Sequence, residues 1–258
     1  MLRLGLQSSP ITIVYSSRTN NCKGESKKAG SPIKKFMRPF IYLIGFLLIA
    51  LLRDNLAGVN TNVNTWATTI HNDFFTSIAK LIADVFETTS LLVLSLIIGA
   101  VLFLLKMREN ALLLVGAMTG NAVILKVLKT LIYSPRPLNG LIPETGNSFP
   151  SGHVTSTVVF FGLLVFFAWK TLKSVRIKAI SSLLAVALAL FVGFTRIYLN
   201  VHWLTDVLAG YFLGAFWLTF CITITPYLVN IYIESVKGQI HKFWPKKNFM
   251  YQMMFVSV

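Results

Sequence analysis

Charged residues are scarce in this chain, and those of negative sign are scarcer still. Asp, Glu, Lys and Arg together make up 13% of the 258 residues, and only nine residues are Asp or Glu. Soluble domains carry about 25% charged residues. Because 55% of the residues are hydrophobic, the composition excludes an ordinary soluble core and indicates a protein that lies in a membrane.

Cysteine is almost absent as well. Cys22 lies in a basic N-terminal stretch and Cys221 lies in an apolar segment, and two such separated cysteines make no disulfide framework. The N-terminal region also lacks the apolar run of a signal peptide, since its best candidate, ITIVY, is too short. We therefore expect residues 1–36 to form a basic, disordered cytoplasmic tail.

The apolar residues fall into six segments. A helix that spans a bilayer needs about 20 residues, and most of the segments reach that length with their flanks. The first reaches it only if Arg53 snorkels and the following NLAGV continues the helix. We predict an all-α integral membrane bundle of six transmembrane helices over residues 37–235, followed by a basic cytoplasmic tail over residues 236–258. The segments are Pro39–Leu52, Thr88–Leu105, Ala111–Leu125, Val154–Trp169, Ala179–Thr195 and Val207–Ile233.

The basic residues are distributed as a topology signal. The net charge is +15, and most of the 24 Lys and Arg residues lie before the first segment, after the sixth, or in the second–third and fourth–fifth loops. With six alternating spans, all of these regions fall on one side, which is cytoplasmic by the positive-inside rule. We expect a multi-pass protein of the cell membrane with both termini in the cytoplasm and no nucleic-acid partner.

The region between the first two segments has its own pattern. Residues 65–86, TWATTIHNDFFTSIAKLIADVF, carry apolar side chains at helical spacing, which predicts an amphipathic helix on the outer face of the membrane. Two interpretations stay open. The helix either lies in the interface without a catalytic role, or it forms a lid or a lipid-entry wall over a site.

Ionisable side chains gather at the outer ends of the last four segments. Three cations and two imidazoles accompany one carboxylate there, which is a poor ligand set for a divalent metal. Arginine and lysine suit phosphate oxygens instead, and Gly152 leaves the backbone open to an anion at the start of a helix. We expect a phosphate site with no metal and no cofactor. Its residues are Lys129, Arg136, Ser151, Gly152, His153, Arg196, His202 and Asp206.

His202 and Asp206 stand four residues apart, a spacing that brings two side chains together on a helix. Asp206 can then accept a hydrogen bond from one ring nitrogen of His202 and leave the other free as a nucleophile. His153 stands where it can protonate a leaving oxygen. We expect the remaining polar and aromatic residues to have no catalytic role, with Lys126 and Trp203 as interface anchors and His71 at the surface. Glu144 and Lys126 are also candidate specificity residues.

Three stretches resemble the signature motifs of the type 2 phosphatidic acid phosphatase superfamily. They are KTLIYSPRP at 129–137, PSGH at 150–153 and TRIYLNVHWLTD at 195–206, with Thr195 where the family usually has Ser. The resemblance implies a metal-independent lipid phosphatase with a phosphohistidine intermediate. His202 is then the nucleophile, Asp206 its partner and His153 the general acid. The phosphate is held by Lys129, Arg136, Ser151, Gly152 and Arg196.

The substrate implied is a membrane lipid phosphate or diphosphate reached from the extracytoplasmic face. Undecaprenyl diphosphate, phosphatidylglycerophosphate and phosphatidic acid all fit, and no obligate protein partner is expected. Two alternatives remain: a non-catalytic lipid-phosphate-binding protein and a transporter. The transporter is disfavoured because its charged groups would lie near the bilayer midplane, whereas here they lie at one edge.

Overall fold

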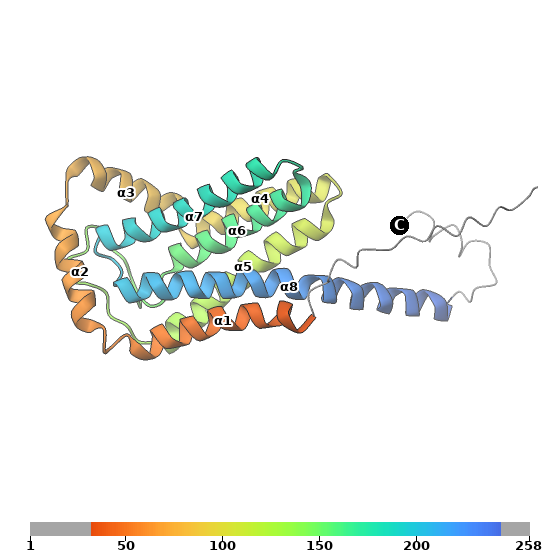
Figure 1. Ribbon diagram of the computed structural model, residues 1–258, viewed down its shortest axis with the longest axis horizontal. Coiled ribbons are helices and arrows are strands. Elements are labelled where there is room, and N and C mark those ends of the chain that lie inside the picture. The colour runs from red at the N-terminus through yellow and green to blue at the C-terminus, as the bar shows by residue number, and fades with distance from the viewer. Residues whose placement is uncertain (1–31, 244–258) are drawn as a thin grey trace, which may run out of the picture. The chain divides into compact units, whose positions relative to one another are not determined.

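The computed structural model describes the backbone of residues 32–243 and the side chains of residues 37–228. The predicted tails, apart from residues 32–36 and 236–243, lie outside the described residues. Every regular element in the described part is a helix, which confirms the all-α class. The helices (Figure 1) are α1 (Pro32–Leu52), α2 (Ala57–Thr69), α3 (Asp73–Val85), α4 (Thr88–Leu104), α5 (Arg108–Leu131), α6 (Gly152–Thr171), α7 (Val175–Tyr198) and α8 (Leu204–Phe243).

Four helices are long and apolar enough to cross a membrane on their own: α5, α6, α7 and α8 up to Leu228. The full helices α5, α6, α7 and α8 contain the predicted third to sixth segments, and α4 matches the predicted second segment to within one residue. Two further spans arise only if each of two bent helix pairs counts as one crossing, the pairs α1–α2, bent by 90°, and α3–α4, bent by 52°. By length and composition the described chain therefore has four to six spans.

The first span is built differently from the prediction. The segment NLAGV does not continue α1, because α1 ends at Leu52 and α2 starts at Ala57 in a direction turned by 90°. The amide of Leu56 donates to the carbonyl oxygen of Leu52 and closes a turn. The polar run at 53–55, with Asp and Asn, favours such a turn. The helix gains its length at its other end, since it begins at Pro32 and has 21 residues.

The predicted amphipathic helix over residues 65–86 is two helices. Asn72 interrupts it, because its Oδ1 accepts from the amide of Phe75 at 2.8 Å and caps the start of α3, a role that asparagine favours. Figure 1 shows α2 running across one end of the bundle, with α3 turning back along it. Both pack on α7, and α2 also packs on α8.

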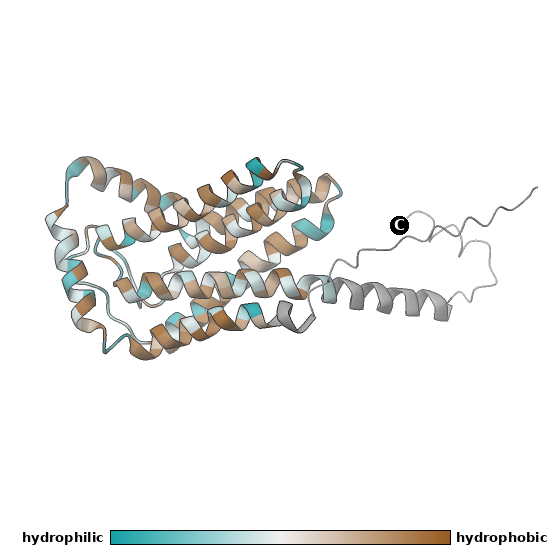
Figure 2. Cartoon of the chain, in the orientation of Figure 1, coloured by the Kyte–Doolittle hydropathy of each residue, from teal (hydrophilic) through white to brown (hydrophobic). Residues whose placement is uncertain are grey.

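Helix α6 lies at the centre of the packing and contacts α4, α5, α7 and α8. Its buried side chains Val159, Phe160 and Leu163 share one apolar cluster with Leu114 and Met118 of α5. Hydrophobic residues cover most of the helical length in Figure 2. Many of them, such as Leu104 and Leu183, are exposed on the outer surface, as expected of helices that face lipid.

Two glycines of α8 allow it to approach α6 closely. A Cβ atom on Gly210 would lie 3.0 Å from the carbonyl oxygen of Ser151, and one on Gly214 would lie 2.8 Å from Cβ of Val158. Small residues permit such contacts between membrane helices. The close approach brings the first turn of α8 against the start of α6, where the amide of Ser151 donates to the carbonyl oxygen of Asp206 at 3.0 Å.

Candidate active site

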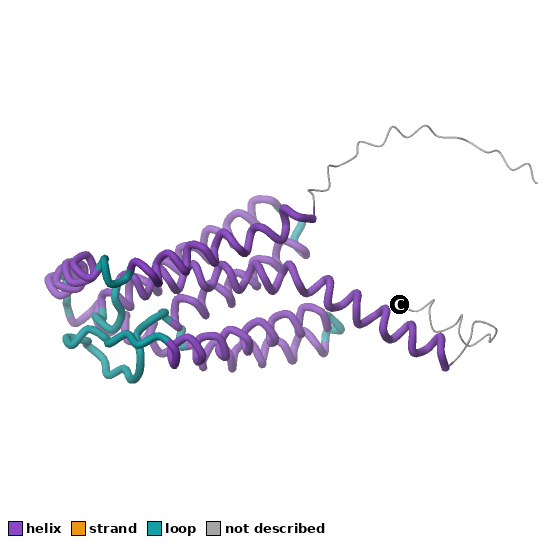
Figure 3. Tube along the Cα trace, turned by 90° about the horizontal axis from the view of Figure 1, so that it is seen from below, coloured by secondary structure: helices purple, strands orange, loops and turns teal. Residues whose placement is uncertain are grey.

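The predicted site residues meet at one end of the bundle. The C-terminal ends of α5 and α7 and the N-terminal ends of α6 and α8 lie there together with α2 and the long loop 132–151 (Figures 1 and 3). All eight predicted site residues sit on these ends or in the adjoining loops. The alternation of helix direction that the sequence predicts is the reason they converge.

His202 and Asp206 form a buried pair. Nδ1 of His202 lies 3.4 Å from Oδ2 of Asp206, and each side chain is 1% exposed. The same carboxylate oxygen accepts from the amide of Trp203 at 2.9 Å, which fixes its position. With the imidazole proton on Nδ1, the lone pair of Nε2 is left for other chemistry.

Arg136 faces that second nitrogen. Its Nη1 lies 3.5 Å from Nε2 of His202 and donates to the carbonyl oxygen of Val201 at 2.9 Å. Its Nε donates to the carbonyl oxygen of Gly146 at 3.2 Å. These backbone contacts hold the guanidinium beside the imidazole before any ligand arrives.

Burial and nearby positive charge set the protonation of this pair of groups. Burial lowers the pKa of His202 well below its ordinary value, and the cations Arg196, Arg136 and Lys129 lower it further. Burial also lowers the pKa of Arg136, against the pull of Glu144 and Asp206. An arginine starts so high that it keeps its charge, so the site presents a neutral imidazole to a fixed cation.

Glu144 joins the two arginines of the site. Arg196 is fully buried, and its Nη2 donates to Oε1 of Glu144, while Oε2 of Glu144 lies 3.4 Å from Nη2 of Arg136. Within the described residues, Nε and Nη1 of Arg196 have no hydrogen-bond partner. Buried donors without partners are costly. This guanidinium therefore suits an anion with more oxygens than a carboxylate has.

The start of α6 differs in part from the expectation. Ser151 occupies the N-cap position, but its side chain makes no capping hydrogen bond, and its buried Oγ has no partner in the described part of the chain. Its amide is engaged by Asp206, so the amides left for an anion at this helix start belong to later residues. The bare Cα of Gly152 faces α4, where a Cβ would lie 3.1 Å from Oγ1 of Thr88. Gly152 is thus also a packing residue.

His153 is held by the outer segment. Its Nε2 lies 3.0 Å from the carbonyl oxygen of Ala83 in α3, and its side chain is buried. If Nε2 donates to that oxygen, Nδ1 is the nitrogen left for another partner. Lys129 lies in the last turn of α5 and is partly buried, whereas Lys126, one turn earlier, is exposed.

The outer helices also bind the third motif directly. Asn60 exchanges two hydrogen bonds with Thr205, at 3.0 and 3.1 Å. Asn64 donates to Oδ1 of Asn200 at 2.9 Å. His71, expected at the surface, is instead partly buried with its Nε2 2.6 Å from the carbonyl oxygen of Tyr198. Helix α2 and the turn after it therefore hold the loop that carries His202 in place.

Trp203 has a contact that an interface anchor does not require. Its Nε1 donates to the carbonyl oxygen of Pro135 at 2.8 Å and links the third motif to the first. This bond, the Glu144 bridge and the Asn60 pair join residues far apart in sequence, and no spacing signal predicts them. Among residues 37–228, whose side chains the structure describes, no group of three or more His, Cys, Asp or Glu side chains could hold a metal ion.

Comparison with known proteins gives consistent matches. The sequence model of the PAP2 superfamily matches residues 110–230. Phosphatidylglycerophosphatase B of Bacillus subtilis is 29% identical over 67% of this chain and 87% of its own length. Undecaprenyl-diphosphatase of Sulfolobus acidocaldarius is 30% identical over 52% of this chain and 60% of its own length. The chain thus spans less than two thirds of the archaeal relative.

A solved structure shares the fold. The crystal structure of a transmembrane PAP2-type phosphatidylglycerolphosphate phosphatase from Bacillus subtilis superposes with a TM-score of 0.69 at 27% identity. The match covers 74% of this chain and 96% of that one. The region of likeness includes all three motifs, since they lie within the residues that the superfamily model matches.

Proposed function

The chain belongs to the PAP2 superfamily, and on that premise we propose that it dephosphorylates a membrane lipid through a phosphohistidine on His202. One observation carries the proposal. The Nδ1 side of His202 faces Asp206, while its Nε2 side faces Arg136 in a buried site. A neutral, oriented imidazole beside fixed cations is what attack on a phosphate requires.

Binding of the phosphate begins with displacement of Glu144. The carboxylate of Glu144 already lies between Arg136 and Arg196, so it marks the position that phosphate oxygens take. The unused donors of Arg196 then find acceptors. Lys129 adds a third positive charge. Phosphoryl transfer mainly requires stabilisation of the negative charge on the transferring group. In this proposal the three cations supply that stabilisation without a metal.

The chemical step forms a bond between Nε2 of His202 and phosphorus while the bond from phosphorus to the leaving oxygen breaks. His153, protonated on both ring nitrogens in the substrate complex, gives that oxygen the proton of Nδ1. Water then attacks the phosphohistidine, His153 takes the proton of that water, and the nitrogen–phosphorus bond breaks to release inorganic phosphate. Asp206 holds the Nδ1 proton and stabilises the imidazole throughout.

The proposed site faces the extracytoplasmic side of the membrane. It lies at the end of the bundle opposite the loops after α4 and α6. Those loops carry Lys106 and Lys173, and the helix ends beside them carry Arg108, Lys170, Arg176 and Lys178. By the positive-inside rule those loops are cytoplasmic. The proposed substrate is a lipid phosphate or diphosphate, and the candidates are phosphatidylglycerophosphate, undecaprenyl diphosphate and phosphatidic acid.

Phosphate release from purified protein in detergent, with EDTA present, tests this function. We expect release from at least one of the three lipids and a loss of about 10³-fold or more in His202→Ala, because that variant removes the nucleophile. The folded state of the variant is checked by its thermal unfolding. Equal release by the variant, or abolition by EDTA, would rule out the proposed mechanism.

A further inference from the structure

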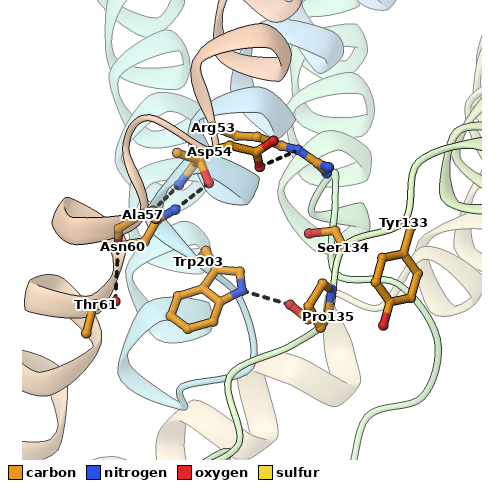
Figure 4. A pocket seen from close by; sticks show the side chains of 10 residues that line it. Arg53, Asp54, Ala57, Asn60, Thr61, Tyr133, Ser134, Pro135 and Trp203 are labelled. Atoms are coloured by element: carbon orange, nitrogen blue, oxygen red, sulfur yellow. Dashed lines mark hydrogen bonds and ion pairs between the residues drawn. The ribbon is translucent and has the colours of Figure 1, made fainter.

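A cavity lies beside the candidate phosphate site. Its volume is about 280 Å³, and it lies between the turn that joins α1 to α2 and the segments that carry Pro135 and Trp203 (Figure 4). Pro135 directly precedes Arg136, and Trp203 directly follows His202. The hydrogen bond between the Trp203 indole and the Pro135 carbonyl, at 2.8 Å, forms part of the wall. The sequence neighbours of Arg136 and His202, two residues of the candidate phosphate site, therefore line this cavity.

Arg53 is the cation of the cavity. Its Nε lies 3.3 Å from Oδ1 of Asp54, and its guanidinium lies 5.8 Å from the ring centre of Phe149, a fully buried residue. Its Nη1 is buried and has no hydrogen-bond partner among the described residues. Figure 4 shows the side chain extended from the end of α1 toward the segment that carries Ser134.

The other polar side chains of the cavity are largely satisfied. Asn60 and Thr205 use their groups on each other, and the Trp203 indole donates to Pro135. Arg53 therefore supplies the cavity with a buried donor that has no partner among the described residues. A snorkelling arginine would extend into water, but the side chain of Arg53 is only 24% exposed and lies over a buried ring. Its orientation suits an anionic ligand better than an interface anchor.

The cavity is flanked by apolar residues that face outward. Leu51 and Leu52, directly before Arg53, are 77% and 46% exposed, and Tyr133 is 77% exposed. These residues lie at the end of a helix in the membrane, where acyl chains give way to headgroups. In a phospholipid, the phosphodiester is the group between acyl chains and headgroup. Arg53 stands at the level where such a phosphodiester would lie.

Building on the proposed function, we propose that Arg53 binds the non-scissile phosphodiester of a phospholipid whose headgroup ends in the scissile phosphate monoester. The two phosphates of such a lipid are separated by a short polyol, which passes beside Trp203 between the cavity and the phosphate site. The charge also fits. A phosphodiester carries one negative charge, and Asp54 beside Arg53 opposes a more highly charged group.

Other lipids do not use the cavity in this way. The phosphates of a lipid diphosphate share one bridging oxygen, so both lie close to Arg136 and Arg196. Phosphatidic acid has a single phosphate, which must lie beside His202 to react, so no phosphate is left for Arg53. Arg53 therefore contributes to binding of the glycerol-bridged lipid alone and acts as a specificity residue.

The test compares Arg53→Gln with Arg108→Gln. Arg108 also has its guanidinium over a phenylalanine ring, that of Phe103 at 5.4 Å, but it lies at the start of α5, away from the site. We expect Arg53→Gln to raise KM for phosphatidylglycerophosphate roughly 10- to 100-fold, the value of one charged hydrogen bond. Its kcat should stay within about twofold, and its kcat/KM for phosphatidic acid should also stay within about twofold. Arg108→Gln should leave KM and kcat unchanged for both lipids.

An equal loss on both lipids, or no loss on phosphatidylglycerophosphate, would overturn the Arg53 proposal while leaving the phosphatase function standing. If the wild-type protein releases no phosphate, a measurement of lipid binding still tests the Arg53 subsite. Quenching of tryptophan fluorescence by dioctanoyl phosphatidylglycerol, which keeps the phosphodiester, is compared with that by dioctanoylglycerol. Preference for the phosphodiester that disappears in Arg53→Gln supports the subsite, and its absence from the wild type overturns it.

Discussion

At the scale of the residue, the surroundings of His202 decide which of its nitrogens can react. One nitrogen is paired with Asp206 and the other faces a cation. The imidazole is buried among positive charges, and both conditions disfavour a second proton. His202 is therefore held in the neutral form that the proposed attack on phosphorus requires.

The pH dependence of kcat/KM tests this state of His202. In the proposed mechanism the neutral imidazole of His202 is the reactive form, and the pKa of His202 is lowered well below its ordinary value by burial and by Arg196, Arg136 and Lys129. Because kcat/KM reports the free enzyme, the acid limb should lie well below pH ~6.5, the ordinary histidine pKa. The profile is first corrected for the second ionisation of the substrate phosphate, near pH ~6. A corrected midpoint at or above pH ~6.5 would contradict the account.

Sequence spacing predicts some of these residue contacts and misses others. The His202–Asp206 pair is expected from a separation of four, although His202 lies in the turn before α8 rather than within it. Glu144 meets Arg196 across 52 positions, and no local pattern encodes that distance. Arg53 looks like an interface anchor in the sequence. Its inward orientation appears only when the α1–α2 turn and Phe149 are placed together.

At the scale of the element, the contact between α6 and α8 aligns the second motif with the third. The glycines of α8 lie against α6, and the hydrogen bond from Ser151 to the Asp206 carbonyl joins the two helix starts. Glycines four residues apart, such as Gly210 and Gly214, permit close packing of membrane helices, and the structure identifies α6 as the partner. The break between α2 and α3 was not predicted, because the apolar spacing runs through the cap at Asn72.

A matched pair of glycine substitutions tests the α6–α8 contact. In Gly214→Ala the new methyl lies 2.8 Å from Cβ of Val158 and 3.0 Å from the Thr155 carbonyl oxygen, and such overpacking costs about 1–3 kcal/mol. In Gly116→Ala nothing lies within 4 Å, so helix propensity favours the variant by up to ~1 kcal/mol. Thermal unfolding in detergent should show a lower Tm for the first variant only. Equal shifts in Tm would show that α8 does not depend on this contact.

At the scale of the whole molecule, alternating helix directions bring four helix ends and a long loop to one side of the described bundle. Hydropathy and charge predict this arrangement well for α5, α6, α7 and α8, because each is one continuous apolar helix. The same signals also locate α1 and α4, but they miss the bends of 90° and 52° that separate these helices from α2 and α3. The bent region supplies the contacts of His71, Asn60 and Ala83 that support the site.

The central claim is that phosphate passes through His202, and trapping the intermediate tests it most directly. Wild-type protein is mixed with lipid that carries a ³²P-labelled terminal phosphate, quenched within milliseconds under alkaline denaturing conditions, and digested for mass spectrometry. The account predicts an acid-labile, base-stable phosphoryl group on the peptide that contains His202, and none in His202→Ala. Turnover without a covalent label, or a label on any other residue, would contradict it.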